Sequence, residues 1–100
     1  MTAQSELSPS TTHYFITAEV DPGVISRVTE LFSLRGIIPD LLKVSRYKMT
    51  ASIPEKLSID IHVSNMSKAD QELIFQKLLS QVCVQNVRKE EHFPIRRLSA

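Results

Sequence analysis

The sequence is poor in the residues that mark a specialised chemistry. It has one cysteine and two glycines among 100 residues, and it has no tryptophan. A lone Cys83 excludes an intramolecular disulfide and is typical of a reducing compartment, so we expect a cytoplasmic protein. The formal net charge is only +1. Such a balance gives no long-range field to attract a nucleic acid or an anionic membrane, and we expect neither as a partner.

Long apolar runs are also missing. No stretch approaches the roughly 18–20 residues that a membrane-spanning helix needs. Residues 1–12 are polar and lack the basic and then apolar segments of a signal peptide, so we expect a disordered leader there. The hydrophobic content of 42% is ordinary for a folded soluble domain. We predict that this domain covers residues 13–92 and that a short basic tail follows over 93–100.

What the chain does contain is a series of short amphipathic segments. The most regular is 57–64, in which every second residue is apolar, as in a strand with one face buried. Pro39 lacks a backbone donor and favours an edge strand or a position just before pairing begins. The predicted elements are a strand over 13–20, a helix from Pro22 to a stop at Gly36, strands over 37–47 and 57–64, a helix from the cap Ser67 to about Gln81, and a strand over 82–91.

This order of elements predicts the fold. A β-α-β-β-α-β chain with only one consistently apolar sheet face must place both helices on that face. The result is an α+β ferredoxin-like sandwich with a four-stranded antiparallel sheet. Right-handed crossovers put the first and third strands in the centre and the second and fourth at the edges.

The connection between the first strand and the first helix organises the chain. Asp21 is suited to cap the helix, and Pro22 fits the first helical position because its missing N–H is not needed there. Gly23 leaves the backbone bare, so a partner or a small anion could approach it closely. By itself, this is also an ordinary capped turn.

A family resemblance emerges in the helix that follows. Arg27-Val28 and Leu31-Phe32-Ser33-Leu34-Arg35-Gly36 resemble the opening of an ACT domain, in particular that of the regulatory (small) subunit of acetohydroxyacid synthase, also called acetolactate synthase. The segment 76–82 is similar to the end of the second helix in that family. The resemblance covers roughly residues 13–91.

The resemblance implies a non-catalytic regulatory module that forms a homodimer through sheet edges or helices and binds an amino acid at the interface. The implied ligand-binding residues are Val20, Asp21, Pro22, Gly23 and Val24 of one chain, with Ile37 and Ile38 from its partner. Valine-sensitive members have Asn where this chain has Val20 and Ile38. Two apolar residues leave the charged groups of an amino acid without partners, so we expect weakened feedback by a branched-chain amino acid.

Other chemistries are less well supported. His13, His62 and His92 are dispersed without metal-ligand spacing, and we interpret them as surface residues. Asp60 and Glu19 could form a carboxylate pair, but no nucleophile accompanies them. An RNA-binding sheet would need more exposed aromatic residues than Phe15. We therefore expect no catalysis, no cofactor and no metal.

Two functional hypotheses remain. The first is a regulatory subunit that binds and activates the large subunit of acetohydroxyacid synthase in branched-chain amino-acid biosynthesis. The second is a free-standing ACT-type amino-acid sensor or dimerisation module without an enzyme partner.

Overall fold

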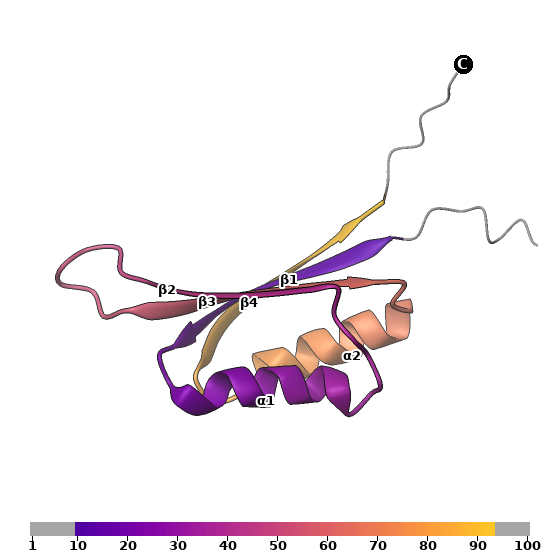
Figure 1. The fold of residues 1–100 in the computed structure, drawn as a ribbon, viewed down its shortest axis with the longest axis horizontal. Helices are drawn as coiled ribbons and strands as arrows, with labels where there is room; N and C mark the ends of the chain where they lie inside the picture. Colours follow the sequence, from indigo (N-terminus) through magenta and orange to yellow (C-terminus); the bar gives the residue numbers. More distant parts are fainter. Residues whose placement is uncertain (1–9, 94–100) are drawn as a thin grey trace, which may run out of the picture.

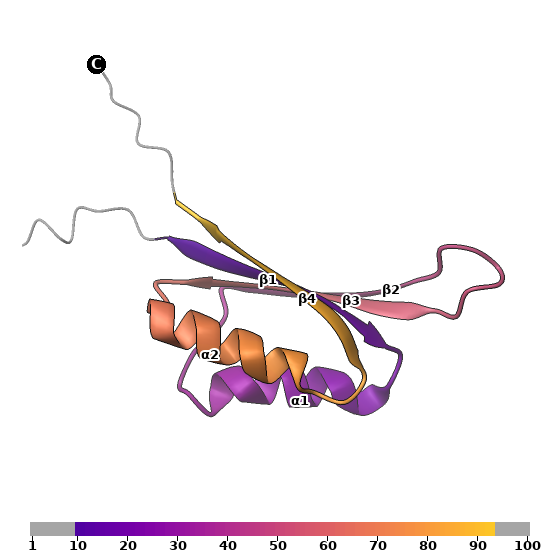
Figure 2. The same ribbon diagram turned by 180° about the vertical axis from the view of Figure 1, so that it is seen from behind.

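The computed structural model describes residues 10–93. The predicted leader over 1–9 and the predicted tail over 94–100 lie outside the described residues. The elements are, in chain order, β1 (Thr11–Glu19), α1 (Pro22–Ser33), β2 (Leu41–Tyr47), β3 (Lys56–Ser64), α2 (Lys68–Leu79) and β4 (Val84–His92). The strands form one antiparallel sheet in the order β2-β3-β1-β4. Both helices cover the same face (Figures 1 and 2). The predicted ferredoxin-like arrangement is confirmed.

The two central strands build the middle of the core. Their register places Tyr14 opposite Ile61 and Ile16 opposite Ile59, and all four side chains are buried against the helices. Strand β1 begins at Thr11 rather than at His13. Thr11 and Thr12 pair with residues of both β3 and β4, so these two residues of the predicted leader belong to the sheet.

The helices bury one stripe each. Val24, Val28 and Phe32 of α1 and Ile74 and Leu78 of α2 are fully or almost fully buried. Helix α1 ends at Ser33, and the chain closes the last turn through Gly36 at φ 69°. The N–H of Ile37 donates to the carbonyl of Phe32 and that of Gly36 donates to Ser33, both at 2.9 Å. This pattern of a left-handed glycine and two reversed hydrogen bonds explains the helix stop.

Strand β2 begins at Leu41 rather than at Ile37, which corrects the predicted boundary. Ile37 is still engaged in closing α1, and Pro39 has no N–H to donate. Pairing starts only at Asp40, whose N–H donates to the carbonyl of His62 at 2.7 Å. The loop between β2 and β3 extends beyond the helices (Figure 1). Within residues 10–93, no helix has the length and apolar character to span a membrane.

Candidate functional site

The turn between β1 and α1 is built around Asp21. This residue is the N-cap of α1, with extended backbone, and its Oδ1 accepts from the N–H of Gly23 at 2.7 Å. Pro22 occupies the first turn of the helix, where its fixed φ suits the helical backbone. The N–H of Val24 donates to the carbonyl of Asp21 at 3.1 Å. The first donors of the helix are therefore already used within the chain.

Arg27 covers the turn from the next turn of α1. A Cβ added at Gly23 would lie 2.7 Å from Nη1 of Arg27, so the absence of a side chain at position 23 is what lets the guanidinium lie there. Nη2 of Arg27 is 3.8 Å from Oδ1 of Asp21. Nε of Arg27 is buried and finds no hydrogen-bond partner among the described residues. The turn thus holds a guanidinium and a carboxylate beside bare backbone at the helix N-terminus.

Cys83 approaches the same turn from the α2–β4 connection. Its thiol donates to Oδ2 of Asp21 at 3.7 Å, and its carbonyl accepts from the N–H of Glu19 at 2.8 Å. Desolvation, followed by the negative charges of Asp21 and Glu19, raises the pKa of the Cys83 thiol. The group therefore stays a protonated donor at neutral pH. Sequence reasoning missed this neighbour, because no local pattern links residues so far apart in the chain.

The second half of the predicted site lies elsewhere. Ile37 and Ile38 follow the C-terminal end of α1, whereas residues 20–24 lie at its N-terminal end. The helix has 12 residues, which corresponds to a length of about 18 Å. Ile37 packs partly against the core, but the side chain of Ile38 is 86% exposed. One chain does not bring the two halves together.

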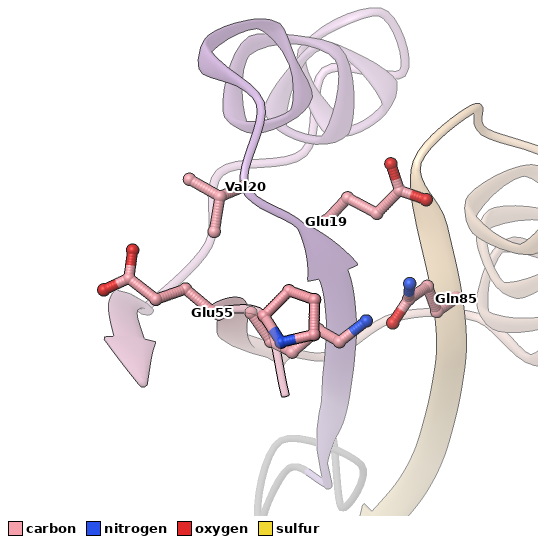
Figure 3. A pocket seen from close by; sticks show the side chains of 6 residues that line it. Glu19, Val20, Glu55 and Gln85 are labelled. Atoms are coloured by element: carbon pink, nitrogen blue, oxygen red, sulfur yellow. The ribbon is translucent and has the colours of Figure 1, made fainter. Parts of the chain in front are cut away.

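A cavity of about 430 Å³ opens beside the end of β1 (Figure 3). Its lining comes from the end of β1, the β2–β3 loop, the start of β3 and β4, and consists of Glu19, Val20, Pro54, Glu55, Lys56 and Gln85. Among the predicted site residues, only Val20 contributes to it. Oε1 of Glu55 is engaged with Nη2 of Arg46 at 2.6 Å. None of the capped-turn residues 21–24 is part of the lining.

Large apolar side chains are left exposed along β2 and on the segment that leads into it. The register places Leu42 opposite Ile61 and Val44 opposite Ile59, so both side chains lie on the helix-covered face of the sheet. They are nevertheless 44% and 38% exposed. Leu34, just after α1, is exposed as well. We call Leu34, Ile38, Leu42 and Val44 the β2-edge residues.

The opposite edge of the sheet is closed by charge. Lys68 of α2 pairs with Glu91 of β4, and Nζ of Lys89 in β4 lies 3.5 Å from Oε1 of Glu72 in α2. Lys89 also lies 5.8 Å from the centroid of the Phe75 ring. Charged side chains of this kind discourage pairing at a sheet edge. The two edges of the sheet are therefore chemically different.

The comparison with protein families identifies the type of domain. The profile of the family described as ACT-like domain matches residues 5–94. In a comparison with curated proteins, none matches the chain.

Three solved structures share the fold. The ACT domain from GTP pyrophosphokinase of Chlorobium tepidum is 11% identical with a TM-score of 0.65, covering 83% of this chain and 100% of that one. The C-terminal domain of the MgtC protein from Mycobacterium tuberculosis is 11% identical with a TM-score of 0.66, covering 90% and 95%. The ligand-free regulatory subunit of aspartate kinase from Thermus thermophilus is 11% identical with a TM-score of 0.59, covering 84% and 56%. At such identities the likeness concerns the fold alone.

Proposed function

The chain belongs to the ACT-like domain family, and on that basis we propose that it is a non-catalytic regulatory subunit that binds an amino-acid effector between two copies of itself. The enzyme that we propose as its partner is acetohydroxyacid synthase, whose large subunit it activates in branched-chain amino-acid biosynthesis. The observation that carries the proposal is the turn formed by Asp21, Gly23 and Arg27, which holds both signs of charge beside bare backbone.

The chemistry of this turn suits an amino acid. A free amino acid carries a carboxylate and an ammonium, and each needs a partner of opposite charge when it leaves water. The guanidinium of Arg27 is a donor for the carboxylate and can bind it through two parallel hydrogen bonds. The carboxylate of Asp21 is an acceptor for the ammonium. Val20, which precedes Asp21 in the chain, is 42% exposed.

The exposed β2-edge residues support a dimer. The β4 edge carries the Lys68–Glu91 and Lys89–Glu72 ion pairs, whereas Leu42 and Val44 leave apolar surface exposed along β2. We therefore place the second copy at the β2 edge. A two-fold dimer uses the same surface on both copies. Pairing β2 with the partner's β2 brings the partner's α1–β2 connection, with its Ile37 and Ile38, toward the turn of this chain and completes the ligand site.

The link to acetohydroxyacid synthase depends on the resemblance in α1. Part of the matching pattern has a structural cause, since Val28 and Phe32 are buried and Gly36 has a positive φ. Arg27 and Leu34 are not fixed in this way, because both are exposed at least in part. These two residues are the part of the match that supports the specific regulatory role. Val20 and Ile38, which replace polar residues of valine-sensitive members, support weakened feedback.

A free-standing amino-acid sensor is the second candidate, and the paired charges of Asp21 and Arg27 fit it equally well. The two functions differ in whether the chain binds acetohydroxyacid synthase and changes its activity. We expect the purified chain to co-purify with the large subunit of acetohydroxyacid synthase and to raise its rate of acetolactate formation at least severalfold. The variant Arg27→Ala serves to separate effector binding from activation, and Lys77→Ala, an exposed residue of α2, is the matched control.

A thermal-denaturation panel against the standard amino acids tests the effector itself. A ligand present at about 100 times its Kd adds roughly 2.7 kcal/mol to the free energy of unfolding, which in a domain of this size raises Tm by about ten degrees or more. A shift with valine, leucine or isoleucine that Arg27→Ala abolishes supports the site. Binding without any association with the large subunit favours the sensor. A flat panel together with no association contradicts both functions.

A further inference from the structure

Three histidines gather on the open face of the sheet, the face that the helices do not cover. His13 of β1 pairs in register with His62 of β3, and their ring centroids are 3.7 Å apart with an interplanar angle of 4°. His92, at the end of β4, lies on the other side of His13, at 4.1 Å and 23°. We call these three rings the histidine stack. The sequence places them far apart, and strand register brings them together.

Aromatic and charged side chains lie around the histidine stack. The ring of Phe15 lies edge-on to His13, with the ring centroids 6.0 Å apart. The guanidinium carbon of Arg88 lies over the Phe15 ring, 4.4 Å from its centroid. The groups that face the stack are Asp60 from β3, Glu90 and Arg88 from β4, and, from β2, Leu41 opposite His62 and Lys43 opposite Asp60. Glu90 accepts from Arg88 and lies 3.1 Å from Nε2 of His92.

Metal binding does not account for the stack. Within residues 10–93, no group of three or more His, Cys, Asp or Glu residues is arranged to hold a metal ion. Proton binding fits the geometry better. Neutral imidazole rings stack favourably, whereas two imidazolium rings at this separation repel each other. His13 is the central ring and is affected from both sides.

We propose that the histidine stack is a proton-sensitive latch that fastens the end of β4 to β1 and β3 at neutral pH and releases it in mild acid. The place of release follows from the topology. β4 is an edge strand, and His92 is its last residue and pairs in register only with Thr11. The N-terminal end of β1 and the C-terminal end of β4 run together away from the helix layer (Figures 1 and 2), where strand pairing, the Lys68–Glu91 ion pair and the stack hold them together.

The direction of the effect follows from the central ring. Burial, followed by the charges of His62 and His92, lowers the pKa of His13 below its ordinary value of 6.5, and Glu90 and Asp60 oppose this only in part. Below pH 6.5 the unlatched or unfolded chain therefore binds protons that the latched chain resists. The stabilisation by the stack is present above that pH and is lost as the pH falls.

Titration of the full chain by NMR tests the latch. We expect His13 to titrate below pH 6.5 and its midpoint to move upward in His62→Gln and in His92→Gln. Amide exchange at the end of β4, corrected for the intrinsic pH dependence, should be at least fivefold faster at pH 5.5 than at pH 7.5 in the wild type. The variant His92→Gln should show less than half of that change.

Thr17→Asn is the matched control, since Thr17 lies on the same face of β1 opposite Ser58 and Asn86. It should leave the change with pH intact. Because His92 lies at a strand end, its variant is expected to fold even where His62→Gln does not. A His13 midpoint at or above 6.5, or a β4 exchange rate that does not respond to His92→Gln, overturns the proposal.

Discussion

The guanidinium of Arg27 lies over the backbone of Gly23, and a Cβ at position 23 would come within 2.7 Å of its Nη1. The same turn therefore starts helix α1 and positions the cation of Arg27. Gly23 is a helical residue whose missing side chain leaves space for the guanidinium of Arg27. In this position the guanidinium lies 3.8 Å from the carboxylate of the N-cap Asp21. An effector that uses this turn must therefore meet Arg27 before it meets the helix N-terminus.

Gly23→Ala is expected to separate folding from binding. The group in the way is the far end of a flexible arginine, which can move, and Ala is better than Gly in a helix by roughly 0.5–1 kcal/mol. Tm should stay unchanged or rise slightly, while effector affinity falls at least tenfold. Gly36→Ala is the contrasting control. Its φ of 69° strains any L-residue by roughly 1–2 kcal/mol, so it should lower Tm instead. Thermal denaturation with and without effector distinguishes the two.

Asp21→Ala should weaken the start of α1. The variant removes the carboxylate oxygen that accepts from the N–H of Gly23, and loss of an N-cap costs about 1 kcal/mol. In a domain of this size that corresponds to a fall in Tm of about 4–8 °C. Asp21→Asn retains a capping oxygen and should remain close to the wild type. Equal losses in both variants would indicate that charge, and not the cap, is what matters.

Local patterns in the sequence predict local features of the fold. The alternation in 57–64, the N-cap Asp21 and the stop at Gly36 are each decided by a few neighbouring residues, and all three are found in the structure. The predicted start of β2 at Ile37 was wrong, although the apolar residues 37–38 resemble the beginning of a strand. The N–H of Ile37 instead closes the end of α1, and Ile38 is exposed. The contact between Cys83 and Asp21 and the histidine stack depend on strand register and chain packing. No spacing in the sequence encodes them.

Restoring polar residues at the predicted ligand site should strengthen binding. Val20 and Ile38 leave an effector's charged groups with fewer partners, and an unpaired buried group costs about 1–3 kcal/mol. The double variant Val20→Asn with Ile38→Asn is expected to gain at least tenfold in affinity for valine, measured by calorimetry. Leu79→Asn is the control, since Leu79 is an exposed residue of α2 and is neither a site residue nor a β2-edge residue. A gain of equal size in the control would contradict the assignment.

Tyr14 should govern part of the response to alkali. Its hydroxyl donates to the carbonyl of Gln71 at 2.8 Å, and burial, helped by Glu72 and Asp70, raises the pKa of the phenol above its ordinary value of 10.0. The folded chain keeps a proton that the unfolded chain loses above pH 10, so stability is present below that pH and falls as the pH rises. Tyr14→Phe should be less stable at pH 7 by about 1 kcal/mol but should lose less between pH 9.5 and 11. Urea denaturation across that range measures both effects, and parallel curves would exclude this role.

Charge placed on the β2 edge should prevent self-association. Leu42 and Val44 are already 44% and 38% exposed, so changing both to Lys costs the isolated chain little. In the dimer that we propose, the same lysines from two copies meet near the two-fold axis without acidic partners, and burying them there is strongly unfavourable. Kd for dimerisation should rise at least 100-fold, which corresponds to about 2.7 kcal/mol, as measured by sedimentation equilibrium.

Val82→Lys is the matched control for that experiment. Val82 is 74% exposed and lies just before β4, so the control adds positive charge at the opposite edge of the sheet and should leave the dimer intact. If the partner's Ile38 completes the ligand site at the turn between β1 and α1, effector binding requires the dimer. The Leu42→Lys/Val44→Lys variant should then also lose the effector-induced rise in Tm, although neither changed residue belongs to the site. A dimer that persists in the Leu42→Lys/Val44→Lys variant but dissociates in Val82→Lys would assign the interface to the β4 edge. A monomer that still binds the effector with full affinity places the whole site within one chain.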